Sequence, residues 1–298
     1  MAHSLGELTL LVPPPRDACT AAELASLRAE LAKRGVVARC VDLGRDPDGT
    51  VRRLVTGGAR WLALCGSDRA LHQIAAAVVE GGPDVVLGVF AGSTRNDFAR
   101  GFGLYTNPRT AAAILAREGE LPIDVGVAHF TGGGAERRSY VLNDVVIGLG
   151  AVALRREARL RPFGRVGGLL AWWSACAAFR RTHVDVDMVF AEWHDTAVQV
   201  RLSNGQFAHD GLHIAPIALP DDGVWDVQVW DGPRSLPFTL QPKMALGEHL
   251  PHKHISQWRQ KQASVTSARP LPVAVDGTAA GTTPVSFELR HRALRLKL

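Results

Sequence analysis

The chain has 298 residues, a mass of 32.0 kDa and a formal net charge of +5, with 46% hydrophobic and 21% charged residues. This composition excludes a disordered chain, and the length is enough for about two domains with a buried core. The modest positive charge is compatible with an acidic partner, such as a nucleotide, an anionic membrane surface or nucleic acid, and selects none of them.

The cysteines and the N-terminal residues indicate the compartment. Cys19, Cys40, Cys65 and Cys176 show no C-x-x-C spacing, so we expect neither a disulfide framework nor a structural zinc site, and a reducing cytoplasm fits best. The N-terminus lacks a basic segment followed by an apolar one, so no signal peptide is expected. The longest apolar stretch, residues 167–179, is shorter than the roughly 20 residues of a membrane-spanning helix. Any membrane contact is therefore expected to be peripheral.

Strands and helices are predicted to alternate in the first part of the chain. Apolar runs indicate buried strands, and apolar residues at helical spacing indicate helices, the first with Thr20 as its N-cap. The predicted strands are residues 8–12, 36–41, 61–65 and 85–90, and the predicted helices are residues 20–34, 49–57, 71–79 and 108–117. This alternation predicts a largely parallel sheet that is covered on both faces.

Downstream of Asp124 the pattern changes to short segments of alternating or β-branched residues, separated by turn residues such as Asn204-Gly205 and Asp276-Gly277. The predicted strands are residues 139–142, 184–190, 197–202, 224–230, 273–275 and 285–289, interrupted by one helix at residues 165–180. This half is predicted to be an antiparallel β-sandwich. We expect an α/β domain at residues 1–123 and a β-sandwich domain at residues 124–298, whose last strand can return to the first domain.

The segment at residues 64–73 (LCGSDRALHQ) is the first that could carry chemistry. It lies between a predicted strand and a predicted helix, and its small residues let backbone N–H groups and the helix dipole face an anion such as phosphate. The alternative is an ordinary strand-to-helix turn with Asp68 as the N-cap, and one glycine and one serine are a weak signal.

The segment at residues 90–104 follows the next strand. Gly92, Ser93 and Thr94 are small enough to approach a phosphate closely, and Asn96 and Asp97 can bind backbone or a metal-bound water. The alternative is an Asx-type turn that caps a helix beginning at Phe98. Both segments are at the carboxyl ends of consecutive strands, where open α/β sheets bind ligands.

Two acidic turns in the second half, residues 219–226 and 275–278, offer carboxylates and carbonyls to a hard cation such as Mg²⁺. Asp-Gly is also a common hairpin turn, which taken alone is the better reading of each segment. His252 and His254 are two residues apart without a third ligand, which favours a surface loop over a metal site.

Taken in chain order, these segments resemble the catalytic family of diacylglycerol kinases, soluble bacterial lipid kinases related to sphingosine kinases and more distantly to NAD kinases. The family's G-G-D-G-T corresponds to G-S-D-R-A at residues 66–70, and its P-L-G-T-x-N-D-F-A-R to A-G-S-T-R-N-D-F-A-R at residues 91–100. Further matches are the I-D-L-G aspartate at Asp124, N-x-x-x-x-G at 143–148, F-G-R at 163–165, N-G at 204–205, A-P at 215–216, D-G-x-x-D at 222–226, and the closing segments 271–277 and 281–284.

The resemblance implies a two-domain lipid kinase that uses ATP and Mg²⁺ in a cleft between its domains, with a lipid or lipid-like substrate and no nucleic acid. The implied nucleotide-binding residues are Gly66, Ser67, Asp68, Arg69, Ala70, Leu71, His72, Thr94 and Asn96. The implied catalytic carboxylates are Asp68 and Asp97, with Asp124 in support. A structural Mg²⁺ would be held by the carbonyls of Leu219 and Val224 and by Asp222. A cytoplasmic protein, peripheral at the inner membrane face and compatible with a homodimer, fits this class.

The chain departs from the family pattern at three functional positions. The family's first loop, N-P-x-S-G, is replaced by V-P-P-P-R-D at residues 12–17, whose prolines lack N–H donors. In the second loop Ser67, Arg69 and Ala70 replace two glycines and a threonine, which crowds the nucleotide, although Arg69 could bind phosphate directly. The family's V-D-G-E ends in Thr278, which cannot serve as the general base that the glutamate provides.

Two functions therefore stay open. In the first, the chain is a lipid kinase in which Asp68, Asp97 or Asp276 replaces the missing base. In the second, it is a catalytically impaired relative that binds lipid or nucleotide as a regulator. The helix at residues 165–180, with Leu169, Leu170, Trp172 and Trp173, either lines a lipid entrance or simply packs in the core.

Overall fold

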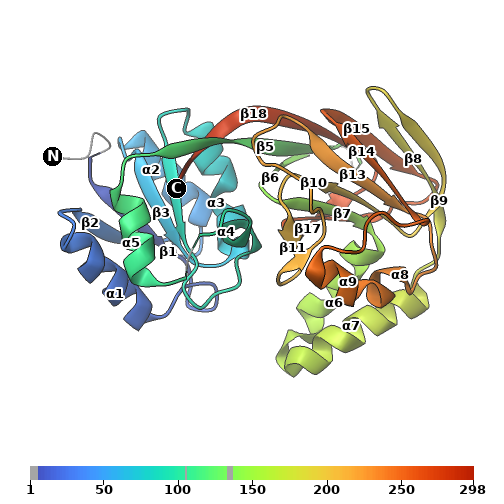
Figure 1. The fold of residues 1–298 in the computed structure, drawn as a ribbon, viewed down its shortest axis with the longest axis horizontal. Helices are drawn as coiled ribbons and strands as arrows, with labels where there is room; N and C mark the ends of the chain where they lie inside the picture. Colours follow the sequence, from blue (N-terminus) through green and yellow to red (C-terminus); the bar gives the residue numbers. More distant parts are fainter. Residues whose placement is uncertain (1–5, 105, 133–136) are drawn as a thin grey trace. The chain divides into compact units, whose positions relative to one another are not determined.

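The computed structural model describes residues 6–104, 106–132 and 137–298. It divides into two units, residues 1–125 with 291–298, and residues 126–290 (Figure 1). The expectation of no signal peptide rests largely on residues 1–5, which lie outside the described residues.

The first unit is built on a parallel sheet. Its strands follow the order β2 (Ala38–Asp42), β1 (Leu8–Val12), β3 (Trp61–Cys65) and β4 (Val86–Phe90). The end of β18 (Val285–Lys297) adds a further parallel strand, with Arg295 opposite Val86. The helices are α1 (Ala21–Ala32), α2 (Pro47–Thr56), α3 (Asp68–Glu80), α4 (Asp97–Gly101) and α5 (Pro108–Ala116). The predicted parallel α/β architecture is confirmed.

The helices of this unit begin at capping side chains. Thr20 forms a capping box with Glu23 at the start of α1, as the sequence predicts. The prediction of Asp68 as an N-cap is wrong, because Ser67 has the extended backbone of a cap, with φ −81° and ψ 167°, and its hydroxyl faces the Ala70 N–H. Likewise α4 begins at Asp97 rather than Phe98, because Asn96 caps it.

The second unit is an antiparallel β-sandwich, as predicted. One sheet has the order β14 (Ile255–Gln260), β13 (Trp225–Trp230), β10 (Gln199–Ser203), β7 (Asp144–Gly148), β16 (Pro272–Val275) and β17 (Thr278–Thr282). The other contains the first part of β18 with β15 (Gln262–Ser267), β8 (Thr182–Met188) and β9 (Glu192–Ala197), together with β5 (Glu120–Phe130) and β6 (Arg137–Val141). A short hairpin of β11 (Phe207–Ala208) and β12 (Leu212–His213) is separate from both.

The two sheets of the sandwich pack through large aromatic side chains. Trp225 on β13 is fully buried and contacts Phe287 on β18, with ring centroids 6.3 Å apart. A Cβ atom at Gly126 on β5 would lie only 2.0 Å from the Trp225 ring, so the indole fills the place of a side chain there. The glycine therefore lets the opposite sheets approach each other around one large core residue.

The prediction of a single helix in this half is wrong. The unit contains α6 (Leu149–Leu160), a 3₁₀ turn (Arg161–Phe163), α7 (Gly164–Ala178), α8 (Leu236–Thr239) and α9 (Gln241–Leu246). α6 follows β7 without a loop, because Gly148 turns the chain with φ 90°, so no turn cluster announces the helix. Among the described residues, no helix combines the length and apolar character that crossing a bilayer requires.

Candidate active site

The loops that follow β3 and β4 are fastened to each other by two polar side chains. The Asp68 carboxylate accepts the backbone N–H of Asp97 through Oδ2 at 2.5 Å and that of Phe98 through Oδ1 at 3.1 Å. In return, Nδ2 of Asn96 donates to the Gly66 carbonyl at 3.0 Å. The structure therefore brings these predicted site residues together, with Asp68 holding the start of α4.

The second loop keeps Asp97 and Thr94 in a confined environment. The Asp97 side chain is 11% exposed, and its Oδ1 lies 3.8 Å from Nε of Arg100. The Thr94 hydroxyl donates to the Ala91 carbonyl at 2.5 Å within its own turn. The polar side chains of this loop are thus held in fixed positions by their neighbours, and phosphoryl transfer requires such fixed groups.

The segment that contains Pro13 and Asp17 fills the space beside Gly66. A Cβ at Gly66 would lie 2.5 Å from the Asp17 carbonyl oxygen and 2.7 Å from the Pro13 ring. That carbonyl accepts the Ser67 N–H at 2.9 Å, and the Asp17 carboxylate lies 4.0 Å from Nε of Arg69. Sequence reasoning missed Asp17, although its place three residues before Thr20, in the altered first loop, was a signal.

The remaining predicted nucleotide-binding residues lie on α3. Ala70 and Leu71 are buried, with their side chains in the core of the first unit, whereas Arg69 and His72 are half-buried. Any contact that Ala70 and Leu71 make with a nucleotide is thus limited to backbone atoms. Arg69 is the cationic side chain that this part of the helix offers to a phosphate.

The Asp124 carboxylate binds the last strand of the chain. Its carboxylate is fully buried, and Oδ1 accepts the Arg292 N–H at 2.7 Å and lies 2.8 Å from Nδ1 of His291. Arg292 has φ 51°, a left-handed conformation at a bend within β18. Asp124 therefore holds the last strand where its backbone bends, and sequence reasoning had no signal for this partner.

In the second unit, Asp276 fastens the hairpin turn that ends at Thr278. Its Oδ1 accepts the N–H groups of Asn143 at 2.9 Å and Asp144 at 3.0 Å, and its Oδ2 accepts that of Leu142 at 3.0 Å. Three backbone donors leave this carboxylate poorly suited to remove a proton. Thr278 begins β17 and pairs with Val275, the hairpin that the Asp-Gly signal predicts.

The carboxylates of the acidic loop in the second unit are paired with an arginine side chain. Oδ1 of Asp222 accepts the Val224 N–H at 3.1 Å, and Oδ2 is paired with the guanidinium of Arg259. The same guanidinium lies 3.9 Å from Oδ1 of Asp226. Arg259 was missed because β14, which places it opposite Asp226, was not predicted.

The second oxygen of Asp226 is buried and has no hydrogen-bond partner among the described residues. Burial raises the pKa of Asp226 to about 6, although Arg259 opposes the shift. A carboxylate with an unpartnered oxygen beside a second carboxylate suits a hard divalent cation. The residues therefore fit Mg²⁺, provided that the ion displaces Arg259 from Asp222.

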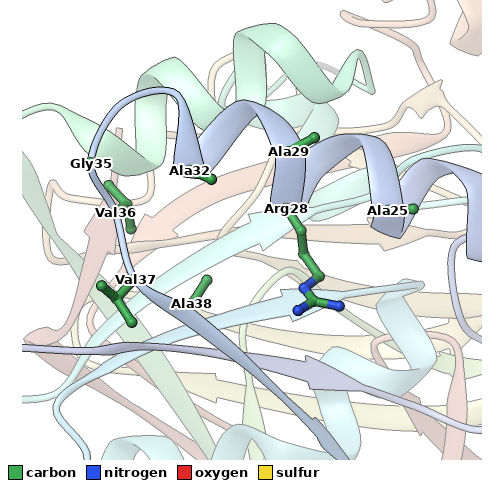
Figure 2. A pocket seen from close by; sticks show the side chains of 8 residues that line it. All are labelled: Ala25, Arg28, Ala29, Ala32, Gly35, Val36, Val37 and Ala38. Carbon is green, nitrogen blue, oxygen red and sulfur yellow. The ribbon is translucent and has the colours of Figure 1, made fainter.

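A shallow groove of about 570 Å³ runs between α1 and the start of β2, in the first unit (Figure 2). Its lining is mostly alanine and valine, and Arg28 is its charged side chain. None of the predicted site residues lines it. The groove therefore offers little to a nucleotide and stands apart from the candidate site.

Comparisons with known proteins agree with this architecture of a parallel α/β unit joined to a sandwich. The model of the diacylglycerol kinase catalytic domain matches residues 17–128, and that of the YegS C-terminal NAD kinase beta sandwich-like domain matches residues 143–298. The two matches cover the parallel α/β unit and the sandwich unit in turn. The chain belongs to the diacylglycerol kinase family, with a YegS-type C-terminal domain.

Individual relatives extend over most of the chain. A "Probable lipid kinase YegS-like" of Pseudomonas aeruginosa is 27% identical over 259 residues, 84% of this chain and 82% of the relative. One of Klebsiella pneumoniae is 23% identical, covering 78% and 76%. The fold is also that of a diacylglycerol kinase from Bacillus anthracis, with TM-score 0.71, 17% identity and coverage of 98% and 96%.

Proposed function

We propose that the protein transfers the γ-phosphoryl group of ATP to a hydroxyl of a lipid or lipid-like small molecule, with Mg²⁺. The observation that carries this proposal is the mutual fastening of the loops after β3 and β4, in which Asp68 and Asn96 fix Asp97 beside the start of α3. Phosphoryl transfer depends mainly on positioning and on neutralising charge, and this arrangement provides the positioning.

The nucleotide would be held by the backbone of residues 66–72, by Arg69 and by the loop of Thr94 and Asn96. Mg²⁺ would be held by Asp222 and the carbonyls of Leu219 and Val224, in exchange for Arg259. When bound, this ion neutralises negative charge. Its position in the second unit gives it a structural role in the acidic loop.

The substrate hydroxyl forms a bond to the γ-phosphorus, the bond to ADP breaks, and the hydroxyl proton must go to a base. Asp68 and Asp276 both accept backbone N–H groups with each of their carboxylate oxygens. We therefore assign the base to Asp97. Asp97→Asn should lower kcat by roughly 10²- to 10⁴-fold while leaving ATP affinity within about threefold, as measured by coupled ADP release and calorimetry.

A second candidate function, binding without transfer, is favoured by one observation. The Pro13 ring and the Asp17 carbonyl occupy the space beside Gly66, and Thr278 stands where the family has a glutamate. In this case the chain binds a nucleotide or a lipid as a regulator.

Calorimetric titration with ATP and Mg²⁺, followed by ATP turnover with mixed lipids, separates the two candidates. Turnover supports the kinase, whereas binding without turnover supports the regulator. In that second case Thr278→Glu should raise turnover at least tenfold if the missing base is the defect, and Thr278→Gln, of similar size without a basic oxygen, should not. Absence of ATP binding by the wild-type chain would sink the kinase proposal.

A further inference from the structure

Helix α7 packs with its small residues inward. Gly167, Ala171 and Ala175, spaced by four residues, are buried on one side of the helix. At Gly167 a Cβ would lie 2.1 Å from the Leu160 carbonyl oxygen, so α7 meets the end of α6 backbone to backbone. The side that an ordinary amphipathic helix fills with leucine is here filled with glycine and alanine.

The large apolar residues of this region point outward instead. Each of the five in and just before α7 is more than half exposed, Trp173 by 63%. Trp173 also contacts Phe238 of α8, which is 39% exposed, with ring centroids 6.4 Å apart. We call these residues the apolar face: Phe163, Val166, Leu169, Leu170, Trp173 and Phe238. A contiguous exposed surface of this kind marks a binding surface rather than a core.

The same part of the chain contains the positive charge. Residues 149–181 include seven arginines and one glutamate, a net charge of +6, whereas the whole chain has +5. The other 265 residues thus have a net charge of −1. The net positive charge is therefore concentrated in the part of the chain that contains the apolar face. Arg155 and Arg159 on α6 are both exposed.

We propose that the apolar face of α7 and α8 docks the protein on an anionic lipid bilayer, with its side chains in the interface and the arginines at the headgroups. Tryptophan, leucine and phenylalanine beside arginines are the composition of an interfacial helix. A second copy of the chain is a poorer occupant, because a symmetric dimer through this face would bring two regions of net charge +6 together. The proposal goes beyond the kinase activity, since docking requires neither ATP nor transfer.

Sedimentation with vesicles tests the proposal without substrate. The wild-type protein should bind phosphatidylglycerol vesicles. Its affinity for phosphatidylcholine vesicles should be at least about tenfold lower. The triple variant Leu169→Ser, Leu170→Ser, Trp173→Ala should bind phosphatidylglycerol about 10- to 100-fold more weakly. Arg155→Glu with Arg159→Glu should remove most of the preference for the anionic lipid.

Phe190→Ala is the matched control. Phe190 is 89% exposed, in the turn between β8 and β9, which lies at the opposite end of the second unit from α7 (Figure 1). This variant should bind vesicles within about twofold of the wild type, and circular dichroism melting should show that all variants fold. Trp173→Phe should keep binding but lose most of the tryptophan quenching caused by brominated phosphatidylglycerol.

Three results would overturn the proposal. The first is no binding of the wild-type protein to either vesicle. The second is equal loss in the triple variant and in Phe190→Ala. The third is a concentration-dependent dimer, seen by analytical ultracentrifugation, that the triple variant abolishes while vesicle binding persists. Because none of these measurements uses ATP, failure here leaves the kinase proposal untouched, and failure of the kinase assay leaves docking untouched.

Discussion

Asp68 in the first unit and Asp226 in the second are both aspartates of candidate ligand loops, but their surroundings are opposite. Asp68 accepts two backbone N–H groups, one on each oxygen, at the start of α4. Asp226 is buried with one oxygen lacking a hydrogen-bond partner among the described residues, and its other oxygen is 3.9 Å from Arg259. A carboxylate whose two oxygens both accept backbone N–H groups stabilises the local structure. A buried carboxylate with an oxygen that accepts no hydrogen bond instead takes up a proton or a cation.

The difference shows which of the predicted acidic residues can change state. Asp68, Asp124 and Asp276 are all engaged by backbone N–H groups, so their carboxylates hold loops, strands and turns together. The loop of Asp222 and Asp226 is instead neutralised by one arginine that reaches across from the neighbouring strand. Three substitutions test this comparison.

The largest effect is expected at Asp68. Asp68→Ala should lower the free energy of unfolding by about 2–3 kcal/mol, because it leaves the first two N–H groups of α4 without their charged acceptor. Urea unfolding followed by circular dichroism measures the loss. Asp68→Asn, which keeps one acceptor oxygen, should lose less than the alanine variant, and equal losses in both would contradict the role of the two hydrogen bonds.

A smaller effect of opposite sign is expected at Asp226. In the folded protein its pKa is raised to about 6 from an ordinary value of 3.8, so the folded state keeps the proton longer than the unfolded chain. Stability therefore falls as pH rises from about 4 to about 6 and then stays constant. Asp226→Asn should remove this slope and raise the free energy of unfolding by about 1–3 kcal/mol at pH 8 in the presence of EDTA.

The same pair of proteins at pH 4 gives the control for Asp226. There the carboxyl is protonated in the folded state and in a substantial fraction of the unfolded chains, so the variant and the wild-type protein should differ much less than at pH 8. Saturating Mg²⁺ at pH 8 should reverse the advantage of the variant, because the ion supplies the missing cation to the wild-type loop. A variant that is less stable than the wild type at pH 8 without metal would refute the burial argument.

The smallest effect is expected at Arg259. Arg259→Gln should lower stability by about 1 kcal/mol at pH 8 without metal, since the arginine side chain is 46% exposed and its ion pairs are partly screened. The variant should also gain at least about tenfold in Mg²⁺ affinity, measured by calorimetry, because the ion no longer competes with a guanidinium. Unchanged affinity would mean that this loop holds no Mg²⁺.

The sequence predicts the first unit well because strands β1, β3 and β4 are buried on both faces and the helices begin at capping residues. The apolar runs at residues 8–12 and 61–65 agree with β1 and β3 to the residue. In the second unit β14 and β15 were missed, since Lys261 alone separates them and no turn residue marks the change. These two strands belong to different sheets, a division that depends on contacts far along the chain.

Some contacts of the candidate site could likewise be predicted from the sequence, and others could not. The hydrogen bonds between the loops after β3 and β4 follow from motifs a few residues long at the ends of neighbouring parallel strands, so their proximity was predictable. His291 beside Asp124 was not predictable, because a distant segment brings it in, and the position of Asp17 in the altered first loop did not reveal its contact with Gly66. The assignment of Asp97 as the base and of the loop at residues 219–224 as the Mg²⁺ site stays a prediction.

The sequence by itself determined the family, the parallel sheet, the sandwich and the short-range helix caps. Each of these follows from local patterns of apolar, small and turn residues. Tertiary structure alone decided that Arg259 neutralises Asp222, which depends on the pairing of β13 with β14. It also decided that α7 hides glycine and alanine and exposes tryptophan and leucine. Hydrophobicity along a chain cannot reveal which side of a largely apolar helix is buried, because the close approach of α6 is what requires the small residues there.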